Sequence, residues 1–133
     1  MKNILVVEDD RSFRHLLCQF LRNNNFHVIE ANNIFMGSHL ANEQYPDLIV
    51  YSLEIVEEIG YQKFQKIHGS STSFEMPLIF LTNNTNHPKL SSSFKKISQL
   101  GAGILLQKTV EFSRILKLIQ AELDKKIGDY YIY

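Results

Sequence analysis

The sequence has little cysteine, no net charge and no long apolar run, and each absence narrows the class of protein. Cys18 is the single cysteine, which excludes an intrachain disulfide and is compatible with a reducing compartment. Lys plus Arg and Asp plus Glu both number 14, and this balance gives no general attraction to nucleic acid or to acidic lipid. No apolar run has the length of a transmembrane helix. We therefore expect a cytoplasmic protein that binds neither a membrane nor nucleic acid directly.

The sequence also lacks the short motifs that assign common enzyme or metal chemistry. It contains no glycine-rich phosphate loop and no nucleophile motif of the G-x-S-x-G kind. The histidines have no zinc-ligand spacing, and we expect each at the surface or its boundary: His15, His27, His39, His68 and His87. The sequence therefore predicts a protein that is not an enzyme and requires no cofactor.

The length and composition of the chain are those of one globular domain. Its 133 residues, 44% of them hydrophobic, are sufficient for a single packed core. We expect a domain over residues 1–126 and a tail over residues 127–133, which contains three tyrosines. The sequence leaves open whether this tail frays or docks on its own domain or on a partner.

Short apolar runs alternate with longer amphipathic stretches along the whole chain. The apolar runs predict strands over residues 4–7, 26–31, 48–51, 78–82 and 104–106. The stretches between them predict helices that begin after Asp9 or Asp10, after Asn32 or Asn33, at Gly60, at Pro88 and at Phe112, with a surface loop from His68 to Glu75. This alternation favours an α/β fold, a doubly wound five-stranded parallel sheet between helices.

Polar side chains that could bind a ligand or take part in chemistry lie at the carboxyl ends of these strands. They are Glu8, Asp9, Ser52, Thr82 and Lys108. In open parallel sheets the carboxyl ends of the strands meet at one edge, and binding sites lie there. We therefore expect these five residues to converge.

Several motifs, taken in order, resemble the response-regulator receiver domain of two-component signalling. They are Ile4 to Asp10, Pro46 to Ile49, Gly60 eight residues after Ser52, Pro77 to Thr82, and Gly101-Ala102 ahead of Lys108. The resemblance covers residues 3–124 and implies a flavodoxin-like (βα)5 receiver fold. It also implies roles for the polar residues at the sheet edge.

In that family the position of Ser52 is an aspartate that accepts a phosphoryl group from a histidine kinase. The resemblance further implies that Glu8 and Asp9 hold Mg²⁺, and that Thr82 and Lys108 contact the phosphoryl group. The sequence departs from the family in several places: Ser52 replaces the acceptor, Leu105 replaces the aromatic residue of the switch, Thr109 replaces a proline, and Ile55-Val56 replaces a common Met-Pro pair. A serine hydroxyl, unlike a carboxylate, needs a base before it becomes a nucleophile. These departures indicate an atypical receiver, or pseudo-receiver, that lacks the acceptor aspartate.

These departures also weaken the expected metal site. We expect weak Mg²⁺ binding through Asp9, with Glu8 acting through water and Glu54 supplying a backbone carbonyl. Glu54 could also restore a carboxylate, because side chains two apart on an extended segment point the same way. The alternative is that the acids cap the first helix and pair with Lys108. Without the proline, we expect a trans Lys108–Thr109 bond, unless a cis bond is strongly held.

The leading hypothesis is a stand-alone atypical receiver that acts as a phosphorylation-independent protein-interaction module. Its partners would be a kinase or an output protein, bound at the fourth helix, fifth strand and fifth helix, where a homodimer would also form. The exposed residues expected on this face are Lys95, Lys96, Glu111, Arg114 and Lys117. One alternative is a functional phosphorelay receiver with an unorthodox acceptor, Ser52 or a nearby acid. Another is an enzyme that uses the acidic cleft with Lys108.

Overall fold

The computed structural model describes residues 1–71, 76–99 and 104–125 and contains one five-stranded sheet. Its strands are β1 (Asn3–Val7), β2 (His27–Ala31), β3 (Leu48–Ser52), β4 (Leu78–Thr82) and β5 (Ile104–Gln107). All pair in parallel in the order β2-β1-β3-β4-β5, which is the flavodoxin-like order. The predicted fold class is therefore confirmed. Gly101, Ala102 and the predicted tail lie outside the described residues.

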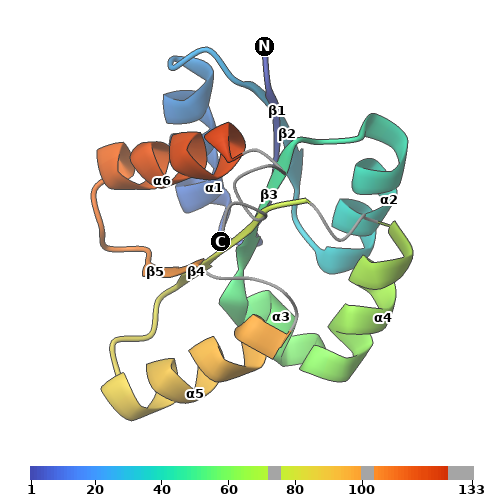
Figure 1. Ribbon diagram of the computed structural model, residues 1–133, viewed down its shortest axis with the longest axis vertical. Helices are drawn as coiled ribbons and strands as arrows, with labels where there is room; N and C mark the ends of the chain where they lie inside the picture. The colour runs from blue at the N-terminus through green and yellow to red at the C-terminus, as the bar shows by residue number, and fades with distance from the viewer. Residues whose placement is uncertain (72–75, 100–103, 126–133) are drawn as a thin grey trace.

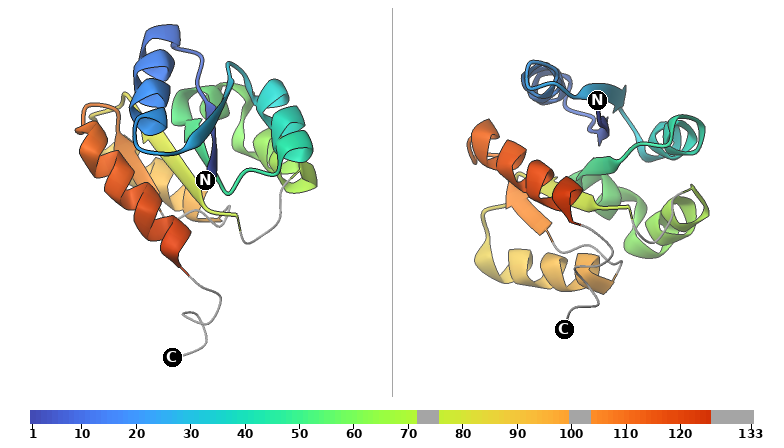
Figure 2. Two further views of the ribbon diagram at one scale, coloured as in Figure 1. Left: turned by 90° about the horizontal axis from the view of Figure 1, so that it is seen from above. Right: turned by 45° about the horizontal axis from the view of Figure 1, so that its top comes forward.

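Helices cover both faces of this sheet (Figure 1 and Figure 2). They are α1 (Arg11–Arg22), α2 (Ile34–Gln44), α3 (Leu53–Ile59), α4 (Tyr61–Ser71), α5 (His87–Gln99) and α6 (Phe112–Asp124). One face packs against α1 and α6, and the other against α2, α3, α4 and α5. Among the described helices, none is both long enough and apolar enough to cross a bilayer.

The central strands are buried on both faces, which explains their unbroken apolar runs. Side chains along β3 alternate between the two cores: Ile49 and Tyr51 pack toward α2 to α5, whereas Leu48 and Val50 pack toward α1 and α6. All five residues of β3 and of β4 are buried. The sheet is therefore a rigid support for the residues that follow its strands.

Side chains cap the first two helices and settle two predictions that the sequence left open. Asp10 caps α1, since its Oδ1 accepts a hydrogen bond from the Phe13 amide at 3.1 Å. Asn33 caps α2 in the same way, through the Met36 amide at 2.8 Å. The helix after β1 therefore begins directly beside Glu8.

Three details of the sequence prediction are wrong. Helix α3 begins directly after Ser52, in a segment predicted to be extended. It buries Leu53 and Val56 one helical turn apart, and Gly60, with a positive φ of 93°, ends it and allows α4 to begin. The predicted loop from His68 is helical as far as Ser71. On α5, helical spacing in the sequence places Phe94 and Ile97 on one stripe, but only Ile97 is buried: Phe94 is 44% exposed and Ser93 is buried beside it.

Candidate functional site

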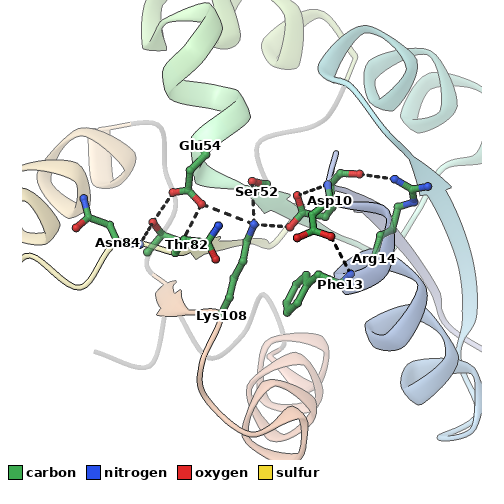
Figure 3. Close-up of polar contacts among 10 residues, drawn as sticks. Asp10, Phe13, Arg14, Ser52, Glu54, Thr82, Asn84 and Lys108 are labelled. Carbon is green, nitrogen blue, oxygen red and sulfur yellow. Dashed lines mark hydrogen bonds and ion pairs between the residues drawn. The ribbon is translucent and has the colours of Figure 1, made fainter.

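The carboxyl ends of four strands bring the predicted polar residues together (Figure 3). Glu8 follows β1, Ser52 ends β3, Thr82 ends β4 and Lys108 follows β5. The backbone places the last two side by side, because the Lys108 amide donates to the Thr82 carbonyl at 2.8 Å. The expected convergence is therefore present for these four residues.

The ammonium group of Lys108 lies at the centre of this group. Its Nζ is 2.5 Å from Glu8 Oε1, 3.3 Å from Ser52 Oγ and 3.6 Å from Glu54 Oε1. The Phe13 ring lies beside it, with the centroid 5.3 Å from Nζ. The Lys108 side chain is only 7% exposed. A buried cation is thus paired with carboxylates from two different elements.

Glu8 is the buried carboxylate of the site, 3% exposed. Burial raises its pKa, whereas the hydrogen bond and charge of Lys108 and the Asp10 amide act in the opposite direction. The Asp10 amide donates to Glu8 Oε2 at 3.1 Å, so both carboxylate oxygens have partners. Arg14 fixes the backbone here, since its Nη1 donates to the Glu8 carbonyl at 2.7 Å.

Asp9 differs from Glu8 although it is the next residue. The Asp9 side chain is exposed, and its carboxyl group contributes to raising the pKa of Glu8. The ion pairs of Lys108 go to Glu8 and Glu54. The predicted alternative, acids that pair with Lys108, therefore describes Glu8 and not Asp9.

Glu54 enters the site from the first turn of α3. Its Oε2 accepts a hydrogen bond from the Thr82 hydroxyl at 2.5 Å, and its Oε1 accepts one from the Asn83 amide at 2.9 Å. The sequence argument selected this residue for the wrong reason, because the turn of a helix, and not an extended segment, directs the carboxylate. The Glu54 backbone carbonyl lies in the first turn of α3, where carbonyl groups point along the helix axis.

Thr82 and Leu105 complete the positions that the resemblance singled out. Thr82 is fully buried, and its Oγ1 also accepts from the Asn84 amide at 3.0 Å. Leu105 is partly buried on β5, paired in register with Phe80, and packs against the core on the α2 to α5 side. The Lys108–Thr109 bond is trans, as predicted. Phe13 and Asn84 were not predicted, because their contacts depend on tertiary placement and no sequence spacing indicates them.

The predicted interaction residues are all exposed, and the helices predicted as the fourth and fifth are α5 and α6. Lys95 and Lys96 lie on α5, Glu111 precedes α6, and Arg114 and Lys117 lie on α6. The Lys96 ammonium lies 5.2 Å from the centroid of the Tyr61 ring, so α5 also contacts α4 there.

The residues present at the site do not fit a tight Mg²⁺ site. Octahedral Mg²⁺ needs several oxygen ligands, usually carboxylates and waters. Here the Glu8 carboxylate is paired with Lys108 and accepts a hydrogen bond from the Asp10 amide. The Glu54 carboxylate accepts hydrogen bonds from Thr82 and Asn83. Within the described part of the chain, no group of three or more His, Cys, Asp or Glu side chains has the arrangement of a metal site.

A second buried polar contact lies on the α2 to α5 side of the sheet. The Tyr51 hydroxyl is 3.1 Å from His68 Nδ1, and the His68 ring stacks on Phe64 with the centroids 5.4 Å apart. Tyr51 also meets Phe64 edge-on and stacks on Phe80. Burial lowers the pKa of His68 to about 4, so the ring is neutral at pH 7. The sequence analysis did not identify this cluster.

Comparison with known proteins identifies the family. The model of the response regulator receiver domain matches residues 4–120. The chain belongs to this family. The polar residues described above therefore lie at the carboxyl ends of the strands of a receiver domain of two-component signalling.

The individual relatives of this receiver share about a third or less of their aligned residues with it. Phosphate regulon transcriptional regulatory protein PhoB of Escherichia coli (strain K12) is 31% identical over 81 residues, which are 61% of this chain and 35% of PhoB. The chain thus spans about a third of the PhoB length. Protein PilH of Pseudomonas aeruginosa is 26% identical over 123 residues, covering 92% of this chain and 98% of PilH. The solved CheY-like receiver of Methanospirillum hungatei JF-1 has a TM-score of 0.79 at 21% identity, covers 93% of this chain and 94% of its own, and supports the fold alone.

Proposed function

We propose that this receiver domain works in two-component signalling as a protein-interaction module whose state does not depend on aspartyl phosphorylation. The proposal rests on one observation. Ser52, the residue at the position that the family uses as acceptor, is 2% exposed, and its Oγ accepts a hydrogen bond from the Lys108 ammonium at 3.3 Å. The domain would therefore be an atypical receiver that lacks the acceptor aspartate.

The chemistry of Ser52 supports this proposal. A serine becomes a nucleophile only when a base removes its proton. Glu8 is the buried carboxylate nearby, and it is already paired with Lys108 at 2.5 Å. The Lys108 ammonium donates to the Ser52 oxygen and is itself protonated, so it does not act as a base there. Neither contact supplies the base that Ser52 needs.

The partner in this proposal is a signalling protein, either a kinase or an output protein. It would bind α5, β5 and α6, where the predicted charged residues are exposed, and a second copy could use the same face. Four of these five residues are basic, which suits a protein partner with an acidic surface. The net charge of the whole chain is zero, which gives no general attraction to nucleic acid. A cytoplasmic location, a domain over residues 1–126 and a separate tail over residues 127–133 also remain predictions.

A second candidate is a phosphorelay receiver with an unorthodox acceptor. Glu54 favours it, because this carboxylate is 38% exposed and lies 3.6 Å from Lys108. A carboxylate is ionised at neutral pH and needs no base. The Glu54 carboxylate already accepts hydrogen bonds from Thr82 and Asn83, so the phosphorelay receiver is the less favoured candidate.

Intact-mass measurement separates the two candidates. The chain is incubated with acetyl phosphate and Mg²⁺ beside a receiver that carries the acceptor aspartate as positive control. We expect no gain in mass while the control gains one labile phosphoryl group. A gain of one phosphoryl group in this chain contradicts the leading proposal, whether it is labile as on a carboxylate or stable as on a serine. Glu54→Gln and Ser52→Ala then identify the acceptor, since the gain disappears in one of them.

A further inference from the structure

Three hydrogen-bond donors from two strand ends converge on the single carboxylate of Glu54. They are the Thr82 hydroxyl, the Asn83 amide and, at the longer distance of 3.6 Å, the Lys108 ammonium. A hydroxyl, a backbone amide and a cation that point at one place form the donor set of an oxyanion site. In this chain the oxyanion is part of the protein itself. We call Glu54 with these three contacts the Glu54 latch (Figure 3).

The Glu54 latch continues as a chain of hydrogen bonds into α5. The Asn84 amide donates to Thr82 Oγ1 at 3.0 Å, and the Asn86 amide donates to Asn84 Oδ1 at 2.8 Å. The Lys89 amide, in the first turn of α5, donates to Asn86 Oδ1 at 3.2 Å. Each contact fixes the next residue of the segment 83–86. The position of Glu54 is thus connected by direct contacts to the start of α5.

Glu54 can leave this position without disturbing a core. Its side chain is 38% exposed, whereas the donor Thr82 is fully buried and is fixed by β4. The Lys108 ammonium would stay in place, because its shorter contact is with Glu8. The site is therefore built into the sheet edge, and its ligand is attached to the short helix α3.

We propose that Glu54 is an internal ligand of an oxyanion site formed by Thr82, Asn83 and Lys108, and that its occupancy fixes the 83–86 segment and the start of α5. This inference rests on the proposed function in one respect: no phosphoryl group at Ser52 competes with Glu54. Release of Glu54 empties the site for a small oxyanion and loosens the helix that carries Lys95 and Lys96. The Glu54 latch thereby sets the state of the proposed interaction face.

The first test is amide hydrogen exchange in Glu54→Ala, with Glu58→Ala as the matched control on the exposed side of α3. Asn83 loses its acceptor in the first variant only, so we expect its amide to exchange at least about tenfold faster there, since this amide then lies open to water. The Lys108 amide, which donates to the Thr82 carbonyl, should keep its rate in both variants. Equal rates for Asn83 in Glu54→Ala and wild type overturn the proposal.

The second test is anion rescue measured by thermal unfolding, with inorganic phosphate as probe and chloride at equal ionic strength as reference. We expect phosphate at tens of millimolar to raise the Tm of Glu54→Ala by about 3 °C more than that of wild type or Glu58→Ala. The excess should disappear in Glu54→Ala with Thr82→Val, which removes one donor at nearly constant volume. Should Glu54→Ala prove unstable, Glu54→Leu keeps most of the volume but removes both acceptor oxygens, so it should show a faster Asn83 amide. The same Tm response in all variants overturns the oxyanion site.

These outcomes are independent of the mass measurement that tests the proposed function. A chain that gains a phosphoryl group can still show rescue, and a chain that gains none can fail to show it. Rescue without phosphorylation supports both proposals, whereas its absence removes the internal ligand alone.

Discussion

Ser52 and Tyr51 are adjacent on β3 and are both 2% exposed, yet they point to opposite sides of the sheet and into different chemistry. Ser52 contacts Lys108, which is paired with Glu8. Tyr51 contacts His68 within a cluster of aromatic rings. The buried Ser52 hydroxyl therefore contacts a cation that is paired with a carboxylate. The buried Tyr51 hydroxyl contacts a histidine ring whose protonation burial disfavours.

The comparison shows two different ways in which a buried polar side chain is stabilised on the same strand. At the charged edge, the Lys108 ammonium pairs with the carboxylates of Glu8 and Glu54, so Ser52 is buried beside charges that are already paired. In the aromatic cluster, burial disfavours the protonated form of His68. The two regions should therefore respond to different perturbations.

The largest expected effect comes from Lys108→Met, which breaks the charged edge. Methionine keeps the apolar stem and removes the cation that pairs with the buried Glu8 carboxylate. We expect a loss of about 3–5 kcal/mol in unfolding free energy, measured by urea denaturation, because an unpaired buried charge is left. The pKa of Glu8 should rise further, so the loss should be smaller at low pH, where the carboxyl is protonated.

Two variants sharpen this prediction. Lys117→Met, on the exposed side of α6, should change stability by less than about 0.5 kcal/mol. Glu8→Gln combined with Lys108→Met removes both charges and should recover more than half of the loss. A loss that is equal in the single and double variants would show that the ion pair is not the cause.

The next effect is acid destabilisation through the aromatic cluster. Folded His68 takes up a proton only near pH 4, whereas unfolded histidine does so near pH 6.5. The unfolded state therefore binds more protons between these values, and stability falls as the pH drops through this window. We expect a loss of up to about 3 kcal/mol between pH 6.5 and pH 4 that depends on His68.

His68→Phe is the control, since it keeps a ring against Phe64 and does not titrate. Subtracting its unfolding curves from those of wild type isolates the contribution of His68 from that of the carboxylates. Parallel curves for the two proteins between pH 6.5 and pH 4 would mean that His68 is not held neutral. Lys108→Met should not alter this difference, because the two regions lie on separate sides of the sheet.

The smallest effect concerns Mg²⁺ at the charged edge. Lys108 already neutralises Glu8, and we expect only weak metal binding through Asp9, with Glu8 acting through water. A titration followed by thermal unfolding should raise the Tm of wild type by less than about 1 °C at 1 mM Mg²⁺. Asp9→Asn should remove this rise. A large stabilisation below 1 mM would contradict the assignment of Lys108 as the cation of the site.

The strands and the convergence of the site were predictable, because their signals are local or topological. Continuous apolar runs mark strands buried on both faces, and a parallel sheet brings their carboxyl ends together. Helix α3 was not predictable in the same way. It has only seven residues, from Leu53 to Ile59, and several of them are equally suited to a strand. The inward turn of Ser93 in place of Phe94 depends on how α5 packs on the sheet, which no spacing records.

The central claim is that the polar edge is complete without a phosphoryl group, and backbone amide NMR of wild type tests it most directly. Resonances of Ser52, Asn83, Asn84 and Lys108 are followed while acetyl phosphate and Mg²⁺ are added. We predict that none of them shifts beyond the change that Mg²⁺ alone produces. A new set of Asn83 and Asn84 resonances that decays as the phosphodonor is exhausted would contradict the account.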